Sequence, residues 1–259
     1  MCNILKADFF KLKKSGVFRA CIALCVLAGF FVVAAMHADM SNAGSRPEAT
    51  GQTLETVSAA QAAATAMSFS FHIIFIAMFV SVFSASEFAS GTVKNTLSRG
   101  ANRGGVFLSK FIAGSVASLA ITLAFASAII ALGTALWGHN AAASPSPGAF
   151  ALMLFLQGFL AIAFCALFTF TSMTLRVAGG AIAANVISVT MFSTVLAAIG
   201  LMTGGEFNLG NLWLAAVVQY FAVFDFGGVS ISRGLAIAGV WTASSLAAGI
   251  CLFARRDVK

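Results

Sequence analysis

The sequence predicts an all-α integral membrane protein with six transmembrane helices, an N-terminal amphipathic helix and an outer re-entrant segment before the last span. The 259 residues are 60% hydrophobic and only 9% charged, with a mean hydropathy of +0.97, whereas soluble domains carry about 25% charged residues. The apolar runs are continuous over about 20 residues and do not alternate, which argues for helices and against a transmembrane β-barrel. The basic residues gather at the ends of these runs.

The N-terminal segment, residues 1–16, is short and basic. Its apolar residues share one helical face: Ile4, Leu5, Phe9 and Leu12. We expect an amphipathic helix on the inner membrane surface, although Asp8 and Phe10 interrupt the pattern and a disordered basic tail is the alternative. The first span follows at about 17–36. It is longer than a signal-peptide core and no clear cleavage site follows, so we expect it to be retained.

Five further apolar runs are long enough to cross a hydrocarbon core of about 30 Å at 1.5 Å per residue. They lie at about 62–85, 111–137, 149–172, 181–202 and 235–253. With the first span they make residues 17–259 one transmembrane domain.

The apolar part of the segment before the last span, residues 212–224, is too short to cross the membrane. Glycine and acidic residues flank it. We therefore expect a re-entrant or an interfacial element on the outer side, and the sequence does not decide between the two.

The distribution of basic residues predicts the orientation. With six spans, thirteen of the fifteen Lys and Arg residues fall on one side, and only Arg46 and Arg233 fall on the other. The positive-inside rule then places both termini in the cytoplasm of a multi-pass protein of the cell membrane. The net charge of +7 is explained by this topology, so we expect membrane lipid and no nucleic acid as a partner.

The most polar internal segment, residues 86–110, joins the second predicted span to the third. It combines an acidic residue, a Gly-Thr pair, basic residues and a Gly-x-x-Arg sequence at set spacings. These residues are Glu87, Gly91, Thr92, Lys94, Leu97, Arg99, Gly100, Arg103 and Lys110. The pattern resembles the cytoplasmic loop of permease subunits of ABC type-2 exporters, and the ending Phe253-Ala254-Arg255-Arg256-Asp257-Val258 resembles the usual end of those chains.

The resemblance extends over nearly the whole chain and implies a function. Such a permease pairs with a second permease chain, as a homodimer or a heterodimer, and with a separate cytoplasmic ABC ATPase that binds ATP and Mg²⁺. The loop 86–110 would dock in a groove of the ATPase and transmit its motion to the spans. Exporters and immunity proteins for peptide antibiotics are common among such permeases, so a peptide antibiotic or amphiphile is the first substrate expected.

The residues of this loop have physical roles that fit coupling. Glu87 lies at the membrane boundary, where its carboxylate can pair with a basic residue and hold the loop. Gly91 permits a turn with positive φ, and Thr92 can cap a short helix at 93–99. The alternative for Lys94, Arg99 and Arg103 is that they only set the topology.

No motif for chemistry on this chain is present. The sequence has no G-x-x-x-x-G-K-[ST], no HExxH and no GxSxG, so we expect no catalytic, cofactor or metal site and an ATPase on another chain. Three polar residues at membrane depth, His72, Gln157 and Asn185, either line a translocation path or bridge helices, and we favour bridging.

Two other classes stay open. A channel or secondary transporter would carry inverted repeats or ionisable groups within the spans, and neither is evident. A membrane sensor or anchor subunit that transports nothing is also compatible with the sequence.

Overall fold

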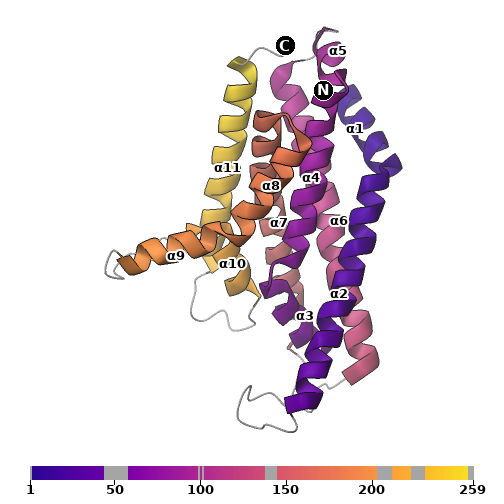
Figure 1. The fold of residues 1–259 in the computed structure, drawn as a ribbon, viewed down its shortest axis with the longest axis vertical. Helices are drawn as coiled ribbons and strands as arrows, with labels where there is room; N and C mark the ends of the chain where they lie inside the picture. The colour runs from indigo at the N-terminus through magenta and orange to yellow at the C-terminus, as the bar shows by residue number, and fades with distance from the viewer. Residues whose placement is uncertain are drawn as a thin grey trace.

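The protein, described from a computed structural model, is an all-helical bundle. The structure describes residues 2–43, 58–98, 100, 102–137, 145–202, 212–222 and 231–255, and these contain no strand. Within them, five helices are long and apolar enough to cross a membrane, and they run along the length of the bundle (Figure 1). They are α2 (Gly16–Ala43), α4 (Phe71–Ala89), α6 (Arg103–Trp137), α7 (Pro147–Leu175) and α11 (Ile231–Arg255).

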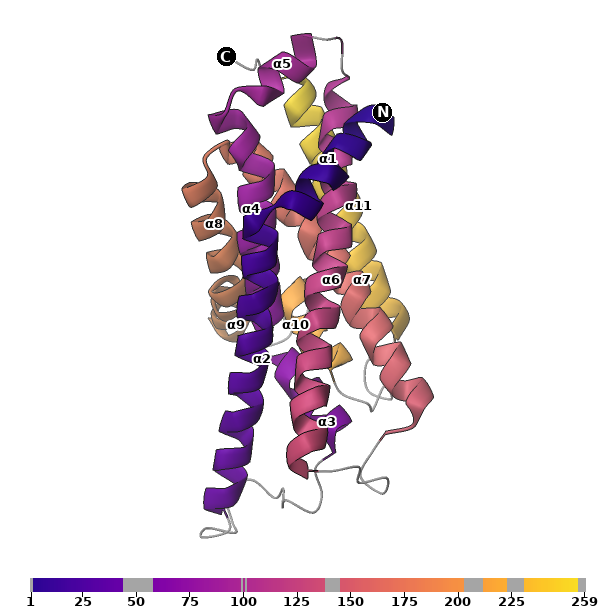
Figure 2. The same cartoon turned by 90° about the vertical axis from the view of Figure 1, so that its right-hand side faces the viewer.

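Two shorter helices lie at one end of this bundle. The N-terminal segment forms α1 (Cys2–Lys14), which packs on α6, and α5 (Thr92–Ser98) lies across the end between α4 and α6 (Figure 2). The last turn of α11 reaches the same end. We call this the α5 end and the opposite one the far end.

Helices α4, α6 and α7 form the centre, because the other long helices pack around them. Helix α2 packs on α6, α11 on α7, and the shorter α8 (Ala178–Thr190) on α4. A stripe of small residues on α6 is buried here: Gly114, Ser118, Thr122 and Ala126. A Cβ at Gly114 would lie 2.9 Å from the sulfur of Cys165 in α7, so the missing side chain lets these two helices approach closely.

The second predicted span is not one continuous helix. Residues 62–85 are divided between α3 (Ala59–Ser68) and α4 by a turn at Phe69 and Ser70. Ser70 has a φ of 59°, the left-handed conformation that ends a helix. A hydropathy profile does not reveal this turn, because the residues before and after it are apolar.

The fifth predicted span, residues 181–202, also differs from the expectation. It consists of α8 and α9 (Phe192–Met202), which meet at Met191, and α9 lies across the direction of the long helices (Figure 1). The 13 residues of α8 extend about 20 Å, less than a hydrocarbon core of about 30 Å. The six-span count is therefore not confirmed. Helix α7 ends at the α5 end, and α11 runs back to that same end.

The turn at Met191 leaves its backbone groups paired. The Met191 N–H donates to the Ile187 carbonyl at 2.8 Å, and the Val195 N–H donates to the Met191 carbonyl at 3.0 Å. Both backbone polar groups of Met191 are therefore satisfied where the chain changes direction, as an apolar surrounding requires.

The segment before the last span contains the short helix α10 (Leu214–Phe221). Its buried side packs against α7, α3 and α11. Trp241 Nε1 of α11 donates to the Leu212 carbonyl at 2.9 Å, and the Trp213 and Trp241 rings meet edge to face. The expected re-entrant or interfacial position stays a prediction, and residues 223 and 224 of that segment lie outside the described residues.

Candidate functional site

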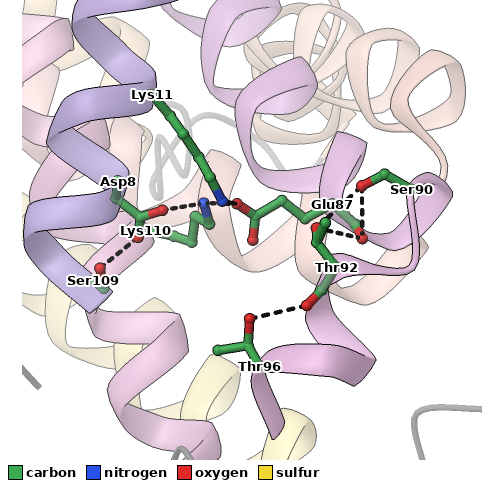
Figure 3. Close-up of polar contacts among 8 residues, drawn as sticks. All are labelled: Asp8, Lys11, Glu87, Ser90, Thr92, Thr96, Ser109 and Lys110. Carbon is green, nitrogen blue, oxygen red and sulfur yellow. Dashed lines mark hydrogen bonds and ion pairs between the residues drawn. The ribbon is translucent and has the colours of Figure 1, made fainter. Parts of the chain in front are cut away.

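Four ionised side chains from three helices meet at the α5 end (Figure 3). Lys110 Nζ of α6 donates to Asp8 Oδ1 of α1 and to Glu87 Oε1 of α4, both at 2.6 Å. Lys11 Nζ of α1 donates to the same Glu87 oxygen at 2.6 Å. We call Asp8, Lys11, Glu87 and Lys110 the ion cluster.

The ion cluster is buried on the side that faces the bundle and is exposed to solvent on the opposite side. The side chains of Lys110 and Asp8 are 2% and 3% exposed, that of Glu87 is 14% exposed, and that of Lys11 is 50% exposed. Ser109 donates a hydrogen bond to the second oxygen of Asp8, and the Lys110 ammonium lies 4.4 Å from the centre of the Phe83 ring. Every buried charge therefore has a partner.

This burial fixes α1 to the bundle. Removing one partner of a buried ion pair costs about 3–5 kcal/mol, because the remaining charge is left uncompensated. Since Lys110 faces carboxylates from both α1 and α4, these two helices and α6 are joined at one point.

The part of the predicted loop that is not helical is shorter than expected. Helix α4 continues to Ala89 and α6 begins at Arg103. Glu87 therefore lies in the last turn of α4, and Lys110 lies two turns inside α6. Glu and Lys are both good helix formers, so helix can continue through these positions.

Two glycines set the direction of α5. Gly91 has a φ of +66°, as predicted, and Gly100 has a φ of +82°. These left-handed conformations suit glycine and turn the chain before and after the helix. α5 spans Thr92–Ser98, one residue earlier than the predicted 93–99.

Thr92 does not cap α5 in the predicted way. Its hydroxyl donates to the Glu87 carbonyl at 3.3 Å and lies 3.1 Å from the Ser90 hydroxyl (Figure 3). Thr92 therefore binds the C-terminal end of α4, where carbonyl groups lack helical partners.

The inner side of α5 packs in a small apolar cluster. Val93 is 1% exposed and contacts a group made by Val106 and Phe107 of α6, Met173 of α7 and Phe253 of α11. Leu97 packs against the same group. The apolar side of α5 thus belongs to a cluster that includes residues of three long helices, while Lys94 and Asn95 are exposed.

The other basic residues of the pattern have separate surroundings. Arg103 donates from Nη1 to the Ala254 carbonyl at 3.1 Å and so binds the C-terminal turn of α11, where positive charge is favourable. Among the described residues, no hydrogen bond or ion pair joins Lys94 to the ion cluster, and its side chain is exposed. Arg99 lies outside the described residues.

Two hollows flank the contact between Lys11 and Glu87. One of about 720 Å³ lies among α1, α5 and α6, and Asp8, Lys110 and Asn95 are among its lining residues. The other, of about 540 Å³, lies among α1, α2 and α4. Across the described residues, no group of three His, Cys, Asp or Glu side chains is placed to hold a metal ion.

The three polar residues at membrane depth differ from one another. Asn185 of α8 bridges helices, because its Nδ2 donates to Ser81 of α4 at 2.8 Å and its Oδ1 accepts from Thr171 of α7. Gln157 of α7 donates to the Val218 carbonyl of α10 at 3.0 Å. Both side chains therefore join helices by hydrogen bonds.

His72 does not bridge helices. It is fully buried in α4, neither ring nitrogen has a hydrogen-bond partner, and its ring stacks on Phe125 with centroids 5.5 Å apart. The structure brings none of these three residues to the ion cluster.

Asp8 is the site residue that sequence reasoning missed. It interrupts the amphipathic pattern of the N-terminal segment. The available signal was its position, because residues 4, 8 and 12 share one helical face and Ile4 and Leu12 are apolar. An acidic residue on the inward face predicts a buried basic partner.

These features define a class of protein: a multi-pass helical membrane protein with an ordered polar element fixed across one end of its spans. The sequence profile described as ABC-2 family transporter protein matches residues 4–192, and the chain belongs to this family. It is thus a permease-type membrane component of a transporter. A comparison with curated proteins gives no match.

Proposed function

We propose that the protein is the membrane-spanning permease subunit of an ATP-driven exporter, and that α5 receives the motion of a separate ATPase. The observation that carries this proposal is the way α5 is held. It lies across the end of the bundle between two glycines of positive φ, with Val93 and Leu97 in an apolar cluster that includes residues of α6, α7 and α11.

A force on the outer side of α5 has defined routes into the spans. The apolar cluster around Val93 leads to α6, α7 and α11. The ion cluster leads from α4 to α6 and α1 through Glu87, Lys110 and Asp8. Close-packed interiors transmit displacement rather than absorb it, so movement of α5 would shift several helices together.

The remaining parts of the proposal follow from the family resemblance and from charge. The α5 end faces the cytoplasm of the cell, because the basic residues gather there. A second permease chain completes the transport path, and ATP and Mg²⁺ bind to the ATPase subunits. The exported substrate is a peptide antibiotic or another amphiphile.

Charge reversal on the outer face of α5 tests the proposal. Lys94→Glu should lower several-fold the amount of ATPase subunit that co-purifies with the permease, and ATP-driven uptake of a labelled peptide antibiotic into inside-out vesicles should fall with it. Lys6→Glu is the matched control, since Lys6 is also exposed at the α5 end but lies on α1. If Lys94→Glu leaves both ATPase binding and uptake unchanged, α5 is not the coupling helix.

A further inference from the structure

The smaller hollow at the α5 end has two kinds of wall. Its apolar wall is formed by Phe79, Val82 and Phe83 of α4 with Val17 of α2. Its rim carries Lys11 and Lys14 of α1, with Ser15, Ser86 and Ser90 nearby. Its volume of about 540 Å³ is within the usual range for small-molecule sites, about 300–1,000 Å³.

The positive charges of the lysines on this rim outnumber the negative charge of its glutamate. Lys14 has no acidic partner among the described residues, and its ammonium lies 4.7 Å from the centre of the exposed Phe10 ring. Lys11 keeps half of its side chain exposed while it contacts Glu87. Glu87 also lines the hollow, but the ion cluster as a whole is neutral, because its two carboxylates face the two ammonium groups of Lys11 and Lys110. The surplus positive charge that the rim presents outward is therefore that of Lys14.

The position of the hollow fits the membrane surface. Val17 lies in the first turn of α2, one of the helices that cross the membrane, and Lys14 is the last residue of α1 just before it. The lysines therefore stand where a spanning helix leaves the hydrocarbon, and the apolar wall continues from them along α4. An amphiphile with an anionic head and apolar chains has this distribution of polarity.

We propose that the hollow among α1, α2 and α4 binds one anionic phospholipid. Its phosphate lies at the ammonium groups of Lys11 and Lys14, each of which offers several N–H donors. Its acyl chains lie against Val17, Phe79 and Val82. This lipid site does not rest on the proposed coupling role of α5, because it would exist in a membrane protein of any activity.

The charge and the apolar wall together select this occupant. A soluble anion would use the lysines and leave the wall in contact with water, which costs about 25 cal/mol per Å² of apolar surface. A zwitterionic lipid would cover the wall but would place a second positive charge near the lysines. Only an anionic lipid satisfies both parts.

Native mass spectrometry of the purified full chain tests the site. The delipidated protein is incubated with equal amounts of phosphatidylglycerol and phosphatidylcholine that have identical acyl chains. We expect one phosphatidylglycerol to be retained in preference to phosphatidylcholine. Lys14→Gln should weaken its retention about fivefold, the effect expected for one lysine at an anionic surface.

Lys13→Gln is the matched control, because Lys13 is the exposed neighbour of Lys14 and does not line the hollow. It should retain phosphatidylglycerol as the unaltered protein does. Val82→Trp, which fills the hollow and keeps every charge, should abolish the retained lipid. Excess inorganic phosphate should not displace the lipid, since phosphate lacks acyl chains.

Three results would overturn the lipid site. They are equal retention of the two lipids, an equal loss in Lys13→Gln and Lys14→Gln, and displacement by inorganic phosphate alone. The equal loss would mean that α1 attracts anions by general charge, and displacement by phosphate would mean that the rim is a free-phosphate site. Both lysines are exposed, so neither substitution is expected to unfold the protein.

Discussion

Lys110 links three helices because its two acidic partners come from different parts of the chain. The sequence predicted that Glu87 would pair with a basic residue, and the same pattern contained Lys110. It did not indicate that Asp8, about one hundred residues away, completes the cluster. Pairings between distant segments depend on packing, and a local pattern does not specify packing.

The first prediction concerns the unequal importance of the charges in this cluster. Lys110→Met should lower the free energy of unfolding by about 3–5 kcal/mol, because it leaves Asp8 and Glu87 buried without their shared cation. Asp8→Asn should cost less, about 1–3 kcal/mol, since Lys110 keeps its contact with Glu87. Equilibrium unfolding in detergent measures both values.

Lys6→Met serves as the control, since Lys6 is exposed on the same helix as Asp8 and should change stability by under about 0.5 kcal/mol. Similar small effects for all three variants would contradict a buried, mutually dependent cluster.

The second prediction concerns His72, whose ring nitrogens have no hydrogen-bond partner. An unpaired buried polar group costs about 1–3 kcal/mol. His72→Phe keeps an aromatic ring next to Phe125 and removes that cost, so we expect a higher free energy of unfolding and unchanged transport. A loss of transport in a stable His72→Phe protein would instead place His72 on the translocation path.

At the scale of elements, the sequence predicted helices in the right places but did not predict the turns that divide some of the apolar runs. Five of the six predicted apolar runs correspond to α2, α4, α6, α7 and α11, and the remaining run corresponds to α8 and α9. The turns at Ser70 and Met191 lie inside apolar runs, where composition does not change across the break. The sequence did not predict that α6 begins at Arg103, because the first two turns of this helix are polar enough to resemble a loop.

The third prediction concerns the contact between α11 and α6. A Cβ at Gly249 would lie 2.2 Å from the Phe107 ring, which is fully buried, whereas a Cβ at Gly239 of the same helix would meet nothing within 4 Å. Gly249→Ala should therefore lower the free energy of unfolding by about 1–3 kcal/mol through overpacking. Gly239→Ala should leave it unchanged or raise it slightly.

Thermal unfolding of the two alanine variants makes the comparison. Adding Phe107→Leu to Gly249→Ala should recover part of the loss, since the smaller side chain makes room. An equal effect of the two glycine substitutions would show that α11 does not approach α6 so closely.

At the scale of the whole molecule, the class and the family were predictable because they depend on composition and on a local pattern. The hydropathy predicted a helical membrane protein, and the match over residues 4–192 confirms the family. The number of spans does not follow from hydropathy alone, because it depends on whether each apolar run keeps one direction. α8 and α9 show that a run can change direction within the apolar region.

The fourth prediction concerns orientation. In a variant whose native cysteines are replaced by alanine, Lys94→Cys at the α5 end should react with a membrane-impermeant thiol reagent only from the cytoplasmic side. Gly148→Cys, exposed at the start of α7 at the far end, should react only from outside. The reverse pattern would place α5 outside the cell, where no ATPase could reach it.

The pairing of two carboxylates with two ammonium groups has a consequence for how α1 responds to ionic strength. Counterions screen charges that water can reach, with a Debye length of about 3 Å at 1 M salt, and they screen buried pairs much less. In the cluster only Lys11 is half exposed, while Asp8 and Lys110 are enclosed. A molar salt wash, which releases peptides held on membranes by surface charge alone, should therefore leave α1 docked and loosen only its outermost contact.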